Sequence, residues 1–203
     1  MRNAMNSSIA AMLLGIVLVG CGAAAKMITV KSQSERTDVF REVADAGAPP
    51  QGFADLVVKA EIKTHREGYY IAESKESPQG KPGYPFVLNV DGQAAVWNVD
   101  GQKDVKPASD EKGKTSKDPE AGTGIKYVLE KKLRLRPGPH RIFFGLPGDK
   151  YATGAVVNAK EGEVHTLEFK PVYRYKTRPT RIPTFKQGIS RYAIFLNGNT
   201  EMR

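Results

Sequence analysis

Two stretches of the sequence, Phe53–Thr64 and Ile125–Arg136, alternate apolar and polar side chains from one residue to the next. In the first stretch every second residue is apolar and most of its neighbours are charged: Ala54, Leu56, Val58, Ala60 and Ile62 against Asp55, Val57, Lys59, Glu61 and Lys63. A period of two is the repeat of a β-strand that has one face in a core and the other in water. The two stretches therefore predict half-buried strands and a fold built mainly from β-sheet.

A five-residue repeat predicts further strands. Asn89–Gln93 recurs as Asn98–Gln102, so that an Asp-Gly pair follows each of two runs of alternating character. Asp-Gly between such runs is a strong signal for a hairpin turn, because glycine tolerates positive φ. We therefore expect strands over 85–90 and 93–99, each followed by a turn, with Trp97 in the core. The alternative of two calcium loops lacks the oxygen ligands at fixed spacing that such loops need.

The same reasoning extends toward the C-terminus. Strands are expected over His140–Leu146 and Ser190–Leu196, with residues 67–72 continuing the pairing of the first strand. Glu161-Gly162 is expected to join 155–159 and 164–170 as a hairpin. The predicted fold class is mainly β: an antiparallel β-sandwich with a short N-terminal helix, a long charged loop and a basic C-terminal strap, of ordinary size for such a domain. The sandwich domain is placed at residues 53–172.

Two segments are expected to lie outside the strands. Residues 21–52 are interpreted as a tether followed by a short helix over Asp38–Ala46, which Thr37 is placed to cap. Lys103–Gly124 holds five lysines, five acids and only one large aliphatic residue, Val105. Such a segment buries too little apolar surface to offset the entropy of ordering it. We therefore expect 103–124 to be a flexible charged loop.

The N-terminus has the features of an export signal. Ile9–Gly20 carries no charge, but it is shorter than the roughly 20 residues that a membrane-spanning helix needs. It fits the apolar region of a signal peptide, which is about 7–15 residues long; the alternative is a helix buried in the fold. The last three residues of this run and the cysteine after it, Leu18-Val19-Gly20-Cys21, resemble the lipobox of bacterial lipoproteins. That resemblance implies that residues 1–20 are a signal peptide and that Cys21 is the site of lipidation, with cleavage before it and fatty acylation of the new amino terminus.

The lipobox resemblance also bears on cellular location. Cys21 is the only cysteine in the chain, and lipidation accounts for an unpaired thiol in an exported protein. Several acyl chains anchor a protein far more firmly than one. Gly22 stands where the sorting rule of enteric bacteria places Asp for retention in the inner membrane. The resemblance therefore implies a protein of the bacterial cell envelope, lipid-anchored in the outer membrane.

A second resemblance covers residues 84–172. The segments NVDGQ, LRLRPGPHRIFF and EGEVHTLEF occur in that order, with Tyr151 between the last two. Together they resemble the small β-sandwich modules of the PEGA and carboxypeptidase-regulatory type. Most of those modules are non-catalytic domains of adhesion or scaffolding. The resemblance implies a binding or structural role and transfers no catalytic residue.

Positive charge is concentrated at the C-terminus. The chain has a formal charge of +9, and residues 170–203 hold eight basic side chains and a single acid, Glu201. This pattern favours an anionic partner, because clustered arginines suit planar phosphate and carboxylate groups. The alternative is that the aromatic residues pack on the sandwich and the arginines form a solvated edge. The residues predicted to bind the partner are Tyr173, Arg174, Tyr175, Lys176, Arg178, Arg181, Lys186 and Arg191.

Motifs of catalysis are missing from the sequence. There is no GxSxG, HExxH, CxxC or GxGxxG pattern, and the three histidines are isolated. We therefore predict no enzyme activity, no metal and no cofactor. The predicted function is a lipid-anchored, non-catalytic binding or structural module that contacts an anionic lipid, a polysaccharide or an acidic envelope protein. Nucleic acid is set aside as a partner because it conflicts with export. The alternative function is a small-ligand or carbohydrate-binding β-sandwich domain of a cell-surface lipoprotein.

Overall fold

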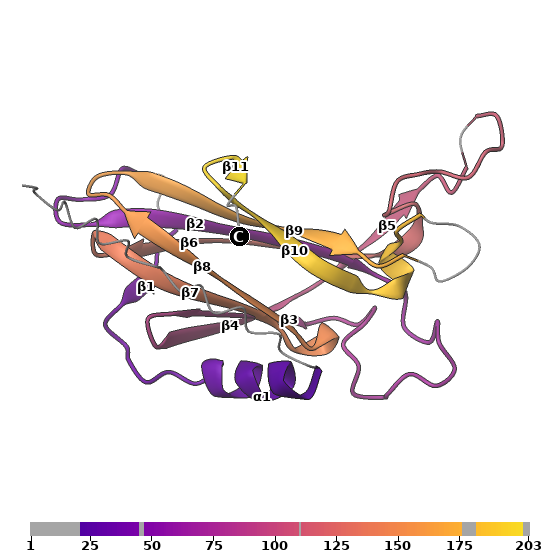
Figure 1. The fold of residues 1–203 in the computed structure, drawn as a ribbon, viewed down its shortest axis with the longest axis horizontal. Helices are drawn as coiled ribbons and strands as arrows, with labels where there is room; N and C mark the ends of the chain where they lie inside the picture. The colour runs from indigo at the N-terminus through magenta and orange to yellow at the C-terminus, as the bar shows by residue number, and fades with distance from the viewer. Residues whose placement is uncertain (1–20, 45–46, 110, 176–181, 201–203) are drawn as a thin grey trace, which may run out of the picture.

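The protein is a sandwich of two β-sheets with one helix on the outer face of the smaller sheet (Figure 1). The computed structural model describes residues 21–44, 47–109, 111–175 and 182–200. The larger sheet has the order β1-β6-β2-β9-β10-β11, with β5 also beside β6. Its strands are β1 (Phe40–Glu42), β2 (Ala54–Thr64), β5 (Gln102–Lys106), β6 (Gly122–Leu135), β9 (Val164–Tyr173), β10 (Ile189–Leu196) and β11 (Asn199–Thr200).

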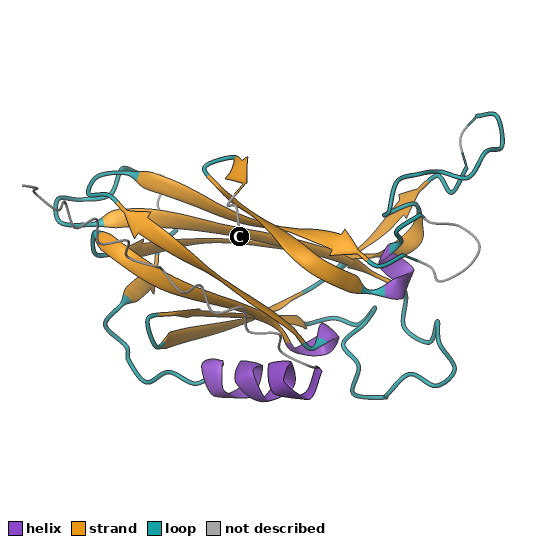
Figure 2. Cartoon of the chain, in the orientation of Figure 1, coloured by secondary structure: helices purple, strands orange, loops and turns teal. Residues whose placement is uncertain are grey.

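The smaller sheet has the order β4-β3-β7-β8. Its strands are β3 (Tyr84–Val90), β4 (Gln93–Val99), β7 (Gly138–Leu146) and β8 (Tyr151–Ala159). The helix α1 (Cys21–Lys31) and two short 3-10 turns, η1 (Pro147–Asp149) and η2 (Phe185–Gln187), complete the fold (Figure 2). The predicted fold class, a mainly β sandwich with one short helix, is confirmed.

Aromatic side chains from both sheets fill the core. Phe144 of β7 stacks on Phe169 of β9 with ring centroids 4.2 Å apart, and Tyr192 of β10 meets Phe144 edge-on at 5.3 Å. The apolar residues of β2 that the alternation predicted to face inward are buried as expected, as is Trp97. Burial of such rings is the main source of stability in a sandwich of this size.

The two copies of the repeat fold differently. In the first, Asp91 and Gly92 both have positive φ, 48° and 95°, and close the β3–β4 hairpin as predicted. The second copy is not a hairpin turn, because the chain passes there from β4 in the smaller sheet to β5 in the larger one. Gly101 is required for a different reason: a Cβ at this position would lie 2.3 Å from the Ile125 side chain and 2.6 Å from that of Tyr127.

Two predicted pairings are wrong because they assumed neighbours along the chain. Residues 155–159 and 164–170 are not a hairpin: Glu161-Gly162 carries the chain from β8 in one sheet to β9 in the other. There β9 pairs in parallel with β2, Asp55 standing opposite Val164. Residues 67–72 do not continue the first strand either, since β2 ends at Thr64 and residues 65–83 form a loop of turns.

The short helix lies elsewhere than expected. The helix expected over Asp38–Ala46 does not form in residues 38–44, because Phe40–Glu42 pairs with β6 as β1, and residues 45–46 lie outside the described residues. The Gln93 side chain holds this strand: its Oε1 accepts hydrogen bonds from the amides of Val39 and Phe40, and its Nε2 donates to the Phe40 carbonyl. The segment expected to be a tether contains α1 instead, and α1 buries Ala24 and Ile28. Long-range packing overrides the local helical pattern.

The expected limits of the loop and of the domain also change. β5 takes up residues 102–106 and β6 begins at Gly122, so the charged loop is reduced to 107–121. The sandwich extends beyond 53–172 on both sides, because β1 precedes that range and β10 and β11 follow it. The strand predicted at Ser190–Leu196 is confirmed as β10.

Candidate functional site at the loop end of the sandwich

Four connecting segments gather at one end of the sandwich, on the right in Figure 1. They are loop 65–83, the described residues of 107–121 and of 174–188, and the turn η1. They meet because β2 and β9 end where the antiparallel strands β6 and β10 begin: Thr64 pairs with Ile125, and Tyr173 with Ile189. We call this region the loop end. Binding residues are commonly carried on loops that a rigid scaffold holds in place.

A buried lysine organises the loop end. Lys63 is the second-last residue of β2 and belongs to the polar face of its alternating pattern. That face was expected to be in water, but the Lys63 side chain is fully buried. Its ammonium donates to the carbonyls of Glu120 (2.7 Å) and Gly122 (2.9 Å) and lies 2.7 Å from Asp104 Oδ2. The same ammonium stands 4.8 Å from the centre of the Phe185 ring. Lys63 thereby joins the ends of three segments, since a buried charge must be satisfied on every side.

Glu120 is the second centre of this network. Its Oε1 accepts a hydrogen bond from the Tyr173 hydroxyl (3.1 Å), and its Oε2 accepts bonds from Lys106 (2.8 Å) and Lys126 (3.1 Å). Burial alone would raise the pKa of Glu120, but the two lysines outweigh it and hold that pKa below its ordinary value. The carboxylate of Glu120 is therefore paired with the ammonium groups of Lys106 and Lys126 at the end of the larger sheet.

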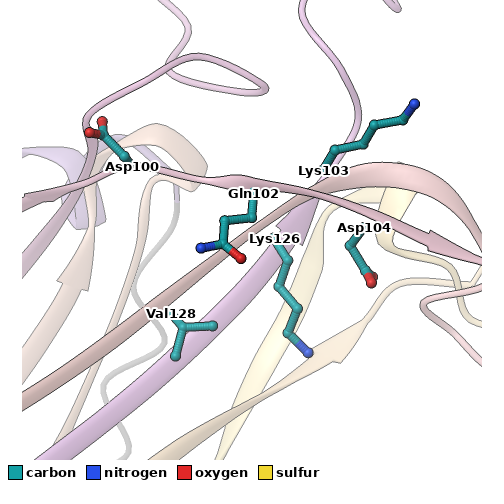
Figure 3. A pocket seen from close by; sticks show the side chains of 6 residues that line it. All are labelled: Asp100, Gln102, Lys103, Asp104, Lys126 and Val128. Carbon is teal, nitrogen blue, oxygen red and sulfur yellow. The ribbon is translucent and has the colours of Figure 1, made fainter.

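A shallow polar pocket of about 250 Å³ opens beside this network, between β5 and β6 (Figure 3). In Figure 3 Lys103 extends away from the other lining side chains. The ammonium of Lys126 is already held by Glu61 (3.0 Å) and Glu120 (3.1 Å). The charge of Lys126 is therefore already balanced by two carboxylates, and the pocket offers polar side chains for hydrogen bonding with a polar ligand. The residues lining it are Asp100, Gln102, Lys103, Asp104, Lys126 and Val128.

A second pocket, of about 320 Å³, lies between loop 65–83 and η2. It contains a serine, a carboxylate and a histidine, in an order that does not suit catalysis. Ser77 Oγ donates to Glu73 Oε1 (2.6 Å), and His65 Nε2 lies 3.5 Å from that same oxygen. In a nucleophilic triad the histidine must stand between the acid and the hydroxyl. Here the carboxylate stands between them, so these contacts fold the loop back on itself.

Loop 65–83 is also fastened to η1. The Tyr84 hydroxyl and the Gln79 amide (3.1 Å) both donate to Asp149 Oδ2. Burial raises the pKa of the Asp149 carboxyl above its ordinary value. These hydrogen bonds hold the C-terminal part of the loop, where it enters β3, against η1.

The predicted partner-binding residues divide into four groups. Tyr173 is buried and belongs to the Glu120 network, so it does not form part of an outer surface. Arg174, Tyr175 and Arg191 are exposed, and the Arg174 guanidinium donates to the carbonyl of Ile189 (2.7 Å). Lys186 is half-buried with its ammonium 5.3 Å from the Tyr69 ring. Three further residues fall in 176–181, outside the described residues: Lys176, Arg178 and Arg181.

Sequence reasoning missed Lys63, Glu120 and the aromatic group of loop 65–83. Nothing in the alternating pattern distinguishes Lys63 from the solvated Lys59, which lies four residues earlier on the same face of the strand. Only the register of β2 against β6 brings Gly122 and Asp104 to its ammonium.

Comparisons with protein-family models, with curated proteins and with solved structures found no match. Within the described residues, no three or more His, Cys, Asp or Glu side chains are grouped so that they could hold a metal ion. No helix in the described part of the chain is both long enough and apolar enough to cross a membrane.

Proposed function

We propose that this protein is a lipid-anchored, non-catalytic module of the bacterial cell envelope, held in the outer membrane by a lipid on Cys21. Its C-terminal basic residues contact an anionic lipid, a polysaccharide or an acidic envelope protein. The observation that carries the proposal is the charge of 170–203, eight basic side chains against one acid, with Arg174 and Arg191 exposed at or near the loop end.

The chemistry of these side chains fits an anionic partner. Arginine presents a planar set of donors that matches phosphate and carboxylate, and its charge does not change over the physiological pH range. Tyr175, two-thirds exposed, adds an amphipathic ring beside Arg174. The acids of the Lys63 and Glu120 network are already paired with lysines, so they do not cancel the charge of these arginines.

The alternative function is binding of a small ligand or a carbohydrate, and one observation favours it. Tyr69 and Tyr70 are about half-exposed beside the pocket of about 320 Å³. Exposed aromatic rings beside polar groups are typical of sugar sites, where an apolar ring face meets hydroxyl-binding groups. Such a site would not depend on the arginines of the C-terminal segment.

Neutralising the basic segment should weaken binding to envelope material. We expect soluble protein of residues 22–203 to co-sediment with purified cell-envelope fractions in a salt-sensitive way. Changing Arg174, Arg178, Arg181 and Arg191 to Gln should lower the affinity at least about tenfold, since each basic residue near an anionic surface contributes roughly 1 kcal/mol. The measurement is the bound fraction at low and at moderate salt.

A matched variant separates location from net charge. Arg41, Arg136, Arg141 and Lys160 are exposed and lie outside both the loop end and the basic segment 170–203, and changing them to Gln removes the same number of charges, four. This control should keep most of the binding. Equal losses in both variants would mean that only net charge matters, and absence of binding by the unmodified protein would remove the anionic envelope partner from the proposal.

A further inference from the structure

We propose that the tip of loop 65–83, made of Tyr69, Tyr70 and Ile71, rests in the headgroup region of the bilayer that holds the Cys21 lipid. The inference rests on the proposed lipid anchor and adds to it a second, non-covalent membrane contact. It assigns the exposed apolar side chains of the loop end to a lipid surface.

The tip is unusually apolar for an exposed loop. Ile71 is fully exposed (107%), and Tyr69 and Tyr70 are exposed by 48% and 43%. Three consecutive large side chains turned to solvent form a continuous apolar patch, and such patches mark interaction sites. Tyrosine is enriched where membrane meets water, because its ring is apolar and its hydroxyl is polar.

The tip is ordered before it meets a partner. Tyr69 stacks on His65 at 5.5 Å between ring centroids, and Tyr70 meets both rings edge-on at 5.0 and 4.8 Å. The Tyr70 hydroxyl donates to the carbonyl of Lys186 at 2.7 Å. Because these contacts hold the rings in place, docking on a surface costs little additional conformational entropy.

The direction of α1 places the lipid on the same side as the tip. Ile28 packs on Gly145, which pairs with Val87 in the middle of β3. At the other end of the helix, the Lys31 carbonyl accepts a hydrogen bond from Asn89, near the end of β3. The helix therefore runs along β3 in the same direction, and its first residue lies toward the start of β3, where loop 65–83 enters. Figure 1 shows α1 and this loop on the same lower side of the molecule.

No spacer separates the anchor from the folded body. The described part of α1 already includes Cys21 and is docked on the smaller sheet through Ala24 and Ile28. Acyl chains on Cys21 would therefore hold the sandwich against the bilayer and would bring the loop end to its surface. The ammonium of Lys186, 5.3 Å from the Tyr69 ring, is placed to meet anionic headgroups while the rings lie just beneath them.

A tryptophan probe tests this placement. We would purify the full chain in its lipidated form as the variants Ile71→Trp and Val164→Trp, the second at an exposed site (48%) at the opposite end of the sandwich. Each is reconstituted in vesicles of phosphatidylcholine and phosphatidylglycerol, with or without brominated acyl chains. The only native tryptophan, Trp97, is buried and supplies a constant background. Bromine should quench Ile71→Trp at least about twice as strongly as Val164→Trp, since only a probe at the interface meets the lipid chains.

The outcomes separate this inference from the anchor itself. Equal and weak quenching at both positions, in protein whose mass shows the lipid, would overturn the membrane contact and leave the anchor intact. A chain that carries no lipid would overturn the anchor on which the inference rests. Ile71 is fully exposed and Val164 about half exposed, so both variants are expected to unfold close to the temperature of the unmodified protein.

Discussion

Replacing Asp55 by asparagine should lower the free energy of unfolding by about 3–5 kcal/mol, the cost of breaking a buried ion pair. Asp55 is fully buried in β2 and accepts two hydrogen bonds from the Arg134 guanidinium, at 2.7 and 2.9 Å. Lys132 adds a third contact at 2.9 Å. Asparagine keeps the shape but removes the charge, so the buried ion pair between Asp55 and Arg134 is lost. Urea denaturation of the two proteins measures the difference.

The control is Asp38→Asn, which removes an Asp–Arg pair of the same geometry on the protein surface. Asp38 accepts two hydrogen bonds from Arg36, both of 2.9 Å, but both side chains are more than half exposed. Asp38→Asn should therefore change stability by less than about 0.5 kcal/mol. A similar small loss at Asp55 would show that burial does not set the strength of that pair.

The pH dependence of the Asp55→Asn effect shows whether the ionised carboxylate stabilises the folded protein. Hydrogen bonds from Arg134 lower the pKa of Asp55 below its ordinary value, despite burial. A carboxyl whose pKa is lower in the folded than in the unfolded protein stabilises the fold above the unfolded pKa and loses this contribution as the pH falls. The gap between the two proteins should therefore be full at neutral pH and shrink in acid.

Replacing Lys63 by methionine should cost about 3–5 kcal/mol and should loosen the loop end. Methionine matches the length of the buried stem but leaves the carbonyls of Glu120 and Gly122 without their donor and the carboxylate of Asp104 without its cation. Denaturation gives the global effect. Hydrogen exchange should show faster opening of the amides that depend on this network, above all that of Phe185, which donates to the Pro119 carbonyl.

Lys59→Met is the matched substitution on the same strand. Lys59 lies on the solvent side of β2, and its contact with Glu130 (3.2 Å) is exposed on both sides. We expect a change within about 0.5 kcal/mol and no change in exchange at the loop end. Unaltered exchange in Lys63→Met would contradict the organising role of that ammonium.

Local sequence patterns predict the strands well and their partners poorly. The alternation in 53–64 predicted which residues of β2 face the core, because a period of two follows from the pleat alone. It did not predict that Asp55 and Lys63 on the other face are buried, because their burial depends on β6, β9 and the loops that cover that face. The parallel pairing of β9 with β2 is likewise invisible locally, since Glu161-Gly162 looks the same in a hairpin and in a crossing between sheets.

The charge of the candidate site can be predicted from the sequence, but its geometry cannot. The concentration of charge in the C-terminal segment could be read directly, but composition does not separate an exposed Arg174 from a buried Tyr173. The repeat shows the same limit: Asp91-Gly92 closes a turn, whereas Gly101 serves a close approach to Tyr127. The aromatic tip of loop 65–83 was placed in a strand, because Tyr and Ile favour strands wherever tertiary contacts do not decide otherwise.

The proposed lipid on Cys21 underlies both the proposed function and the proposed membrane contact of the loop tip, and mass spectrometry tests it directly. The full chain would be expressed in a bacterial host that processes lipoproteins, beside the variant Cys21→Ala. The predicted result is a mature chain that begins at Cys21, with diacylglyceryl on the thiol and a fatty acyl group on the amino terminus, found in the membrane fraction. Cys21→Ala should keep residues 1–20 and carry no lipid. An unmodified Cys21 in the wild-type chain, with or without cleavage, would contradict the lipid anchor.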